Sequence, residues 1–322
     1  PRTLPPHPAP CTPHPEFMSL LVVGSVALDS VETPFGKADE VIGGSATFFS
    51  AAASLLSPVQ LVGVVGDDYP VHKLKPLENR GVDLAGLEHM KGRSFRWRGR
   101  YRHDLNAAET LETHLGVFSN FSPKIPPQFR GAQFVFLGNI DPRLQLDVLT
   151  QVGKPKLVAC DTMNFWIESR RPDLLKLLER VDAITLNDGE ARQLTDCYNL
   201  LKAAKWIMAR GPSLVIIKKG EHGAFMFTGN TVFFAPAFPL EEVFDPTGAG
   251  DAFAGGFMGY LARSGDVTEA NLRRAVIYGS AMGSFAVEQF SIDRLMTVDS
   301  KQLAERVAEF RRLVAFEEAI GG

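Results

Sequence analysis

Short apolar runs alternate with longer amphipathic segments along most of this chain. The apolar runs, each bounded by turn or cap residues, predict buried β-strands at 20–25, 59–65, 133–137, 156–160, 183–186 and 214–218. Segments with a helical period accompany them, at 45–56, 143–152, 172–180, 200–209, 249–263, 269–288 and 300–316. Residues 225–228 and 232–235 indicate a late hairpin across Gly229 and Asn230. This order predicts an α/β fold in which helices flank a mainly parallel central sheet.

Residues 31–42 and 94–117 depart from this alternation, because apolar and polar residues there repeat every two positions. One face carries Phe95, Trp97, Tyr101 and His103, and the other carries Arg96, Arg98, Arg100 and Arg102. We predict a small antiparallel β-sheet that stands off the main sheet, and we call it the lid. The arginine face is typical of a solvated surface, although a phosphate or partner contact is also open. The aromatic face needs burial against a substrate or another subunit.

The composition leaves room for a large core and indicates no highly charged partner. The 322 residues are 45% hydrophobic and 22% charged, with a formal net charge of −3. No charge imbalance indicates nucleic acid binding, and no apolar run reaches the length of a membrane span, so we expect neither partner. The three cysteines lack metal-ligand spacing, which favours a reducing, cytoplasmic setting.

The first seventeen residues differ from the rest of the chain. They contain seven prolines and no hydrophobic stretch, so they match neither a secretory signal nor a folding unit. We expect residues 1–17 to be a disordered leader or an artefact of cloning or annotation. Met18 is then the expected start, and residues 18–322 form one domain.

A glycine-rich segment, Asp245-Pro-Thr-Gly-Ala-Gly-Asp251, leads directly into the predicted helix at 249–263. The small residues Gly248, Ala249 and Gly250 let a ligand approach the backbone, and the first turn of a helix favours an anion such as phosphate. Asp251 would repel phosphate, so we interpret it as the base that accepts a proton from an attacking hydroxyl. A simple helix cap is the alternative. The segment predicts phosphoryl transfer to an alcohol.

This seven-residue run resembles the C-terminal signature of the ribokinase-like (PfkB) carbohydrate kinase family, and the resemblance extends over residues 20–316. It implies a ribokinase-like fold with a β-sheet lid that closes over the substrate, and it allows a homodimer through the lid. It further implies an ATP- and Mg²⁺-dependent kinase that phosphorylates a hydroxyl of a small sugar. Asp251 would be the general base, and Gly248 to Gly250 would form the anion hole.

Residues in the N-terminal half match the family's acceptor site. Asp29 resembles the aspartate that binds substrate hydroxyls, and Gly43 and Gly44 resemble the glycine pair that lets substrate approach. Asn139, at a predicted strand exit, is a further candidate contact. Phe48 stands where many members carry a substrate-binding asparagine, and a phenyl ring cannot replace those hydrogen bonds. We therefore expect a substrate pocket different from that of ribokinase itself.

Other motifs match the nucleotide site of the family. Asn187 and Glu190 form its Asn-x-x-Glu motif, in which the glutamate holds Mg²⁺ through water. Lys219, Gly220 and Gly223 resemble a strand-end segment around the nucleotide, and Ser284 lies on a small-residue helix expected beside the adenine. Lys218 and Lys219 are equally well explained as phosphate-attracting or as surface residues.

Two further positions concern bound ions and phosphate. Asp161 and Asn164 partly match an Asp-Pro-Asn segment, but Phe165 and Trp166 occupy the stretch where a basic residue often follows. In some members the residue matching Asp245 helps hold a monovalent cation, which leaves K⁺ activation open.

Two other functions are compatible with these motifs. A nucleoside is the alternative acceptor, because Phe95 and Trp97 can stack on a base and Phe48 makes the pocket more apolar. A catalytically silent binding protein on the same fold is less well supported, because binding alone does not need Asp251. A P-loop is excluded, since no Gly-x-x-x-x-Gly-Lys-Ser/Thr string occurs, and the histidines lack zinc-ligand spacing.

Overall fold

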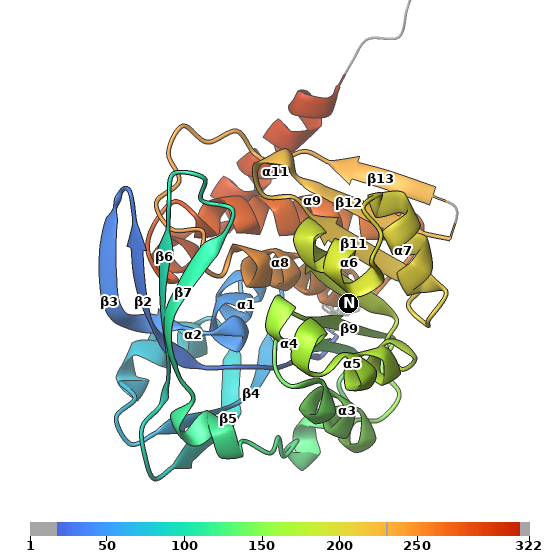
Figure 1. Cartoon of the computed structure of the whole chain (residues 1–322). Coiled ribbons are helices and arrows are strands. Elements are labelled where there is room, and N and C mark those ends of the chain that lie inside the picture. The colour runs from blue at the N-terminus through green and yellow to red at the C-terminus, as the bar shows by residue number, and fades with distance from the viewer. Residues whose placement is uncertain (1–17, 230, 316–322) are drawn as a thin grey trace, which may run out of the picture.

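A nine-stranded sheet forms the centre of the protein in the computed structural model, which describes residues 18–229 and 231–315 (Figure 1). The predicted leader lies outside the described residues. The strand order is β13-β12-β11-β10-β9-β8-β1-β4-β5, and the strands from β11 to β5 pair in parallel. Their bounds are β1 Leu20–Val23, β4 Val59–Gly66, β5 Val82–Met90, β8 Phe134–Leu137, β9 Leu157–Asp161, β10 Ala183–Asn187, β11 Leu214–Lys218, β12 Ala224–Thr228 and β13 Thr231–Ala235. The last two form the predicted hairpin.

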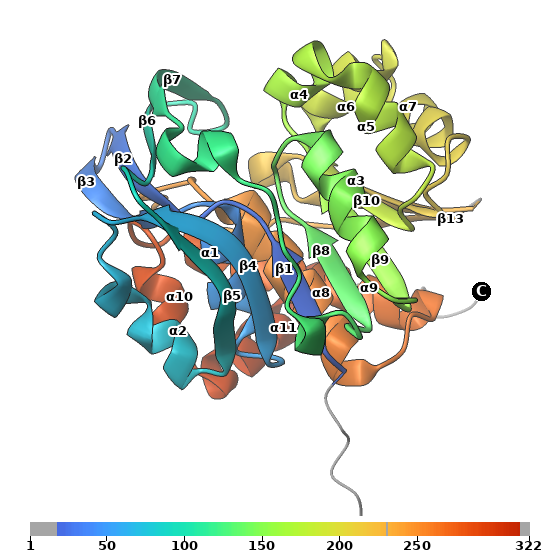
Figure 2. The same cartoon turned by 90° about the horizontal axis from the view of Figure 1, so that it is seen from below.

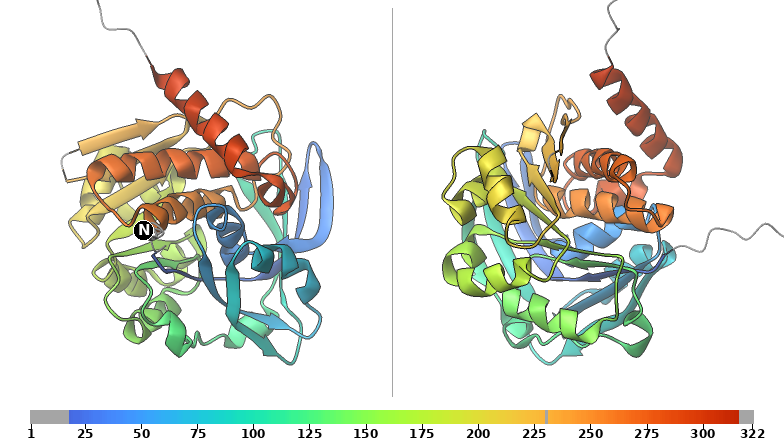
Figure 3. Two further views of the ribbon diagram at one scale, coloured as in Figure 1. Left: turned by 180° about the vertical axis from the view of Figure 1, so that it is seen from behind. Right: turned by 90° about the vertical axis from the view of Figure 1, so that its right-hand side faces the viewer.

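Helices cover both faces of this sheet, as the view from below shows (Figure 2). Alternate residues of β1 point to opposite faces, so Leu20 and Val22 join one core cluster and Leu21 and Val23 the other. The first cluster is completed by α1 Ser45–Ala53, α2 Lys75–Asn79, α8 Ala249–Ser264, α9 Glu269–Ala286, α10 Asp293–Thr297 and α11 Ser300–Val314. The second contains α3 Pro142–Gln151, α4 Asn164–Ser169, α5 Arg171–Leu178, α6 Asp188–Thr195 and α7 Leu200–Met208. Helix α11 packs against α9 at the outside of the molecule (Figure 3).

The lid is a separate four-stranded sheet at the left of Figure 1. Its order is β3-β2-β6-β7, with bounds β2 Ala27–Thr33, β3 Gly36–Gly43, β6 Phe95–Tyr101 and β7 Ala108–His114. The central strands β2 and β6 run parallel, whereas the outer pairs are antiparallel. The predicted α/β class, with a mainly parallel sheet, flanking helices and a small second sheet, is confirmed.

The side chains of β6 clarify the two faces of the lid. On the arginine face, Arg96 lies 2.7 Å from Glu40 and 2.8 Å from Asp68, and its side chain is only 14% exposed. Arg100 pairs with Glu32 on the neighbouring strand at 3.2 Å. On the other face, Phe95 stacks on Phe118 of the same chain, with ring centroids 5.3 Å apart. Arg96 and Arg100 are therefore paired with acidic residues of the same chain, and Phe95 is packed within the chain, so these side chains do not need a phosphate or another subunit as a partner.

Three features differ from the sequence-based expectations. Strand β2 begins at Ala27, so Asp29 lies inside a lid strand and not in a loop after the first strand. Strand β5 was not predicted, because as an edge strand it mixes buried and exposed residues without clear alternation. The short helices α2, α4, α6 and α10 were also not predicted, because helices of 5 to 8 residues give at most about two turns of periodic signal.

Candidate active site

Most of the predicted nucleotide-site residues meet at the carboxyl edge of the parallel sheet. Asp161, Asn187 and Lys218 are the last residues of β9, β10 and β11. A pocket of about 610 Å³ lies at this edge. Its walls include the side chains or backbone of Asn139, Asp161, Asn187, Glu190, Lys218, Gly220, Gly223, Ala249, Gly250, Asp251 and Ser284. Ligands of open α/β sheets bind at this edge, so the pocket is the candidate nucleotide site.

The start of α8 forms the floor of the candidate anion hole. Gly248 is the N-cap residue, it has φ 72, and no side chain caps this helix end. A Cβ atom on Gly248 would overlap the ring of Phe48. Phe48 itself is only 2% exposed. The sequence suggested that Phe48 shapes the acceptor pocket, but in the structure its ring supports the turn at Gly248.

Asp251 occupies the first turn of α8, where it is partly exposed to the pocket and lies among other charged groups. Burial raises its pKa to about 7, and the negative charges of Asp161, Asp29 and Glu190 act in the same direction. The ammonium group of Lys218 acts against them. A carboxylate with a pKa near neutrality can accept a proton and release it again at physiological pH.

Lys218 and Asp161 form a buried ion pair beside this helix end. The Lys218 Nζ atom lies 3.1 Å from Asp161 Oδ2, and the two side chains are 17% and 7% exposed. Burial alone would lower the pKa of Lys218, but the charges of Asp161, Glu190 and Asp251 outweigh it and raise the pKa. A Cβ atom on Gly250 would lie 2.8 Å from Lys218 Nζ, so the ammonium group contacts the anion-hole backbone.

Asn187 and Glu190 make a reciprocal capping box at the start of α6. The Asn187 N–H donates to Glu190 Oε2 at 2.7 Å, and the Glu190 N–H donates to Asn187 Oδ1 at 2.8 Å. Burial, followed by the charge of Asp161, raises the pKa of Glu190 to about 7. Glu190 therefore both caps helix α6 and lines the pocket.

The carboxylate groups that line the pocket suit a magnesium ion that keeps its water shell. Glu190, Asp161 and Asp251 all line the pocket, and bringing them together is costly without a cation. Within residues 18–229 and 231–315, no group of three or more His, Cys, Asp or Glu side chains is close enough to hold a metal ion directly. Glu190 as a ligand through water stays a prediction.

The predicted acceptor residues lie together where the lid meets α1. Asp29 is 5% exposed, and its Oδ2 atom accepts a hydrogen bond from the Gly44 N–H at 3.3 Å. Burial raises the pKa of Asp29 to about 7, and the charge of Asp245 adds to it. A Cβ atom on Gly43 would overlap the Asp29 carboxylate, and Gly44 has φ 92, so both positions require glycine.

The lid contributes two residues that the motifs did not indicate. Thr247 Oγ1 donates to the Tyr101 hydroxyl at 3.4 Å, and burial raises the pKa of Tyr101 to about 12. Asn106, in the loop between β6 and β7, donates to Glu221 at 2.8 Å across the pocket. These contacts connect the lid to the signature segment and to the nucleotide wall. The period-two aromatic face was the available signal for Tyr101.

Three other predicted residues have distinct environments. Asp245 is 1% exposed and accepts hydrogen bonds from the N–H groups of Thr247 at 2.9 Å and Ser291 at 3.4 Å. Its role towards K⁺ stays a prediction. Asn139 lines the pocket, and its side-chain oxygen is buried without a hydrogen-bond partner among the described residues. Lys219 is not among the residues that line the pocket, and its Nζ lies 6.0 Å from the Phe225 ring centroid.

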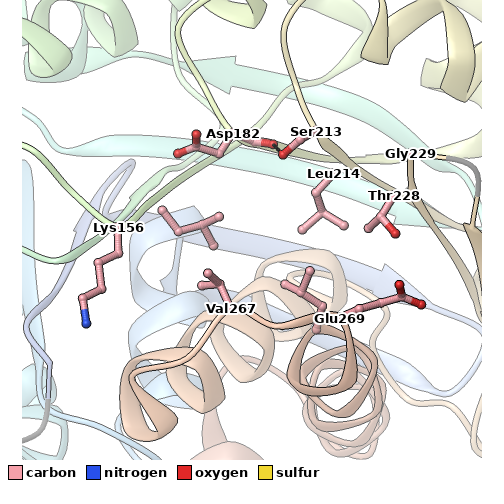
Figure 4. A pocket seen from close by; sticks show the side chains of 10 residues that line it. Lys156, Asp182, Ser213, Leu214, Thr228, Gly229, Val267 and Glu269 are labelled. Carbon is pink, nitrogen blue, oxygen red and sulfur yellow. Dashed lines mark hydrogen bonds between the residues drawn. The ribbon is translucent and has the colours of Figure 1, made fainter.

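A second hollow of about 490 Å³ lies at the opposite edge of the sheet, where β9, β10 and β11 begin (Figure 4). Lys156 and Glu269 stand at opposite sides of it (Figure 4). Asp182 in its wall accepts the Val158 N–H at 2.7 Å, which is a structural role. Of the residues that the structure describes, none that was predicted for catalysis or binding lines this hollow.

None of the helices within the described part of the chain is both long and apolar enough to cross a membrane.

Comparison with known proteins identifies the family. A sequence model described as "pfkB family carbohydrate kinase" matches residues 22–296. The chain is 31% identical over 260 residues to a cytidine kinase of Thermococcus kodakarensis, covering 79% of this chain and 92% of that protein. It is 26% identical over 290 residues to the ribokinase of Bacillus subtilis, covering 80% and 90%.

A solved structure agrees at the level of the fold. The nucleoside kinase of Burkholderia thailandensis in complex with inosine superimposes with a TM-score of 0.73 at 20% identity, covering 90% of this chain and 97% of that chain. The protein therefore belongs to the pfkB family of carbohydrate kinases and is a phosphotransferase that acts on a hydroxyl group.

Proposed function

We propose that this protein transfers the γ-phosphoryl group of ATP to a hydroxyl of a nucleoside, with Asp251 as the general base. The observation that carries the proposal is the position of Asp251. It lines the nucleotide pocket together with Asn187 and Glu190, and it is close enough to Asp29 on the acceptor side for their charges to interact. One carboxylate thus lies between the two candidate substrates.

The reaction follows from this arrangement. Asp251 accepts the hydroxyl proton as the acceptor oxygen attacks the γ-phosphorus, while Asp29 holds the acceptor by hydrogen bonds. The backbone of Gly248 to Gly250, at the positive end of α8, stabilises the charge that spreads over the transferred group. Magnesium, when bound near Glu190, neutralises part of the phosphate charge. The contacts of Tyr101 and Asn106 close the lid over the site, which excludes water as a competing nucleophile.

Trp97 favours a nucleoside as the acceptor. Its residue is the register partner of Asp29 in the parallel pair β2 and β6, so the two side chains lie on the same face of the lid. The indole is held by a hydrogen bond from Nε1 to Thr110 at 3.2 Å, and a fixed aromatic plane suits stacking on a base. The similarity to a cytidine kinase and to an inosine-binding kinase supports the same choice.

A small free sugar, which the sequence motifs indicate, is the second candidate. Asp29 and Asn139 have side-chain oxygens of a type that can accept hydrogen bonds from hydroxyl groups of either class of acceptor. The similarity to ribokinase supports this candidate.

The acceptor can be identified by measuring ADP release from MgATP over a panel of nucleosides and free sugars. We expect turnover with a nucleoside, and we expect Trp97→Leu to raise the KM for that nucleoside about tenfold with little change in kcat. Tyr198→Leu, at a side chain that is 87% exposed, is the control. Turnover with sugars alone, or an unchanged KM in the Trp97 variant, would remove the base-stacking role.

The pH dependence should report the raised pKa of Asp251. A base must be ionised, so kcat/KM should rise with pH and level off above a midpoint near 7. Stability should change in the opposite direction, because a carboxyl with a raised folded pKa stabilises the fold below about pH 4 and loses this contribution as pH rises through 7. A midpoint near 4 would contradict the assignment.

Asp29 also has a pKa raised to about 7, so the two carboxyls titrate together. The Asp29→Asn variant separates them. Its residual kcat/KM should still rise with pH, with a midpoint at or below 7, because Asp251 still has to ionise.

A further inference from the structure

Lys218 is the sole basic side chain among the described residues that line the nucleotide pocket. Four acidic residues, Asp161, Glu190, Glu221 and Asp251, line the same pocket. A nucleoside triphosphate would add several negative charges to this surface. The lining therefore contains one protein cation to meet the phosphates, and its position decides which phosphate it can reach.

The ammonium group of Lys218 faces the anion hole. It lies 3.1 Å from Asp161, and a Cβ atom on Gly250 would be 2.8 Å away from it. An ammonium group has three N–H donors, and among the described residues only the Asp161 carboxylate accepts one of them. Two donors thus remain beside the backbone of Gly250, where the proposed function puts the transferred phosphoryl group.

The neighbouring elements do not supply an equivalent charge. The stretch after β9, Asp161 to Trp166, contains no basic residue, and the side chain of Lys219 lies by the Phe225 ring and outside the pocket lining. The side chain of Lys218 is 17% exposed, so bulk water screens its charge only in part.

We propose that Lys218 is a catalytic residue that donates hydrogen bonds to the γ-phosphoryl group of ATP during its transfer, while Asp161 orients the ammonium group. This inference rests on the proposed function. In the step, the bond between the γ-phosphorus and the β,γ-bridging oxygen breaks, a bond to the acceptor oxygen forms, and the hydroxyl proton moves to Asp251. Lys218 stays protonated throughout and compensates the charge on the transferred oxygens.

Calorimetric titration with MgADP and with the magnesium complex of AMP-PNP, a non-hydrolysable ATP analogue, tests this contact without an acceptor. We expect Lys218→Met to weaken AMP-PNP binding about tenfold more than ADP binding, because only AMP-PNP carries a γ-phosphoryl group. Lys301→Met, at a side chain that is 83% exposed on α11, should leave both affinities unchanged. Equal weakening for both nucleotides, or none for either, would overturn the proposal.

A double variant separates direct contact from charge compensation. Lys218→Met leaves the buried Asp161 carboxylate unpaired, whereas Asp161→Asn with Lys218→Met removes both charges together. We expect the double variant to unfold near the wild-type temperature and still to discriminate poorly between the two nucleotides. Recovery of the wild-type preference for AMP-PNP would show that Lys218 merely neutralises Asp161.

These binding results are independent of the acceptor assay. Failure of the wild-type protein to phosphorylate any acceptor, with the γ-phosphoryl preference dependent on Lys218, would contradict the proposed function and leave the contact standing. If the wild-type protein phosphorylates an acceptor but Lys218→Met does not change the nucleotide preference, the proposed function stands and the Lys218 contact is contradicted.

Discussion

Replacement of Asp251 by Asn is expected to lower kcat by a factor of about 10²–10⁴, which is the usual contribution of a general base. The amide has nearly the same shape as the carboxylate, so α8 and the anion hole should keep their geometry. Affinity for MgADP should stay within about threefold of the wild type, because the variant keeps Asn187, Glu190 and Lys218. Steady-state kinetics and calorimetric titration measure the two quantities separately.

The same variant should be more stable than the wild type at pH 8. Asp251 is partly desolvated and lies near the charges of Asp161, Asp29 and Glu190, so its ionised form opposes folding. Its replacement should therefore raise the melting temperature at pH 8 and have little effect below pH 4. Asp173→Asn on α5, which pairs with Lys176 at the surface, is the matched control. Near-normal turnover in Asp251→Asn would exclude the residue as the base.

Gly248→Ala should damage both stability and turnover. The position has φ 72, which L residues rarely adopt, and the new Cβ atom would overlap the buried ring of Phe48. Backbone strain and overpacking together should cost at least about 2 kcal/mol in the free energy of unfolding. Because the turn that must shift is the anion hole itself, kcat should fall by at least about tenfold. Urea unfolding and steady-state kinetics test both effects.

Gly131→Ala is the control for this substitution, because no described atom lies within 4 Å of a Cβ atom at that position. A second variant, Gly248→Ala with Phe48→Leu, divides the loss between its two causes. Partial recovery of stability would assign that part to the Phe48 ring. A wild-type free energy of unfolding in Gly248→Ala alone would refute the proposed packing.

Local patterns in the sequence predicted many of the strands and helices. Strand β11 was predicted because Leu214 to Ile217 form a short continuous apolar run, which is typical of a strand buried on both faces. Helix α8 was predicted because apolar and small residues follow the signature segment over 16 residues. Asn187 and Glu190 were recognised as a motif from the sequence because they are only three residues apart, whereas their capping box at the start of α6 was not predicted. The edge strand β5 was not predicted, because its buried and exposed residues do not alternate clearly.

The sequence by itself determined the α/β order, the lid strands, the signature segment and the family to which they point, since each is recognised from a pattern within a short segment of the chain. Only the tertiary structure decided which side chains from other elements lie near Asp251 and the rest of the signature segment. Lys218 comes from β11, Tyr101 from the lid and Phe48 from α1, and their contacts with the signature segment span long stretches of chain. The raised pKa of Asp251 and the orientation of Lys218 depend on burial and on charges brought from other strands, and a one-dimensional pattern does not encode those distances.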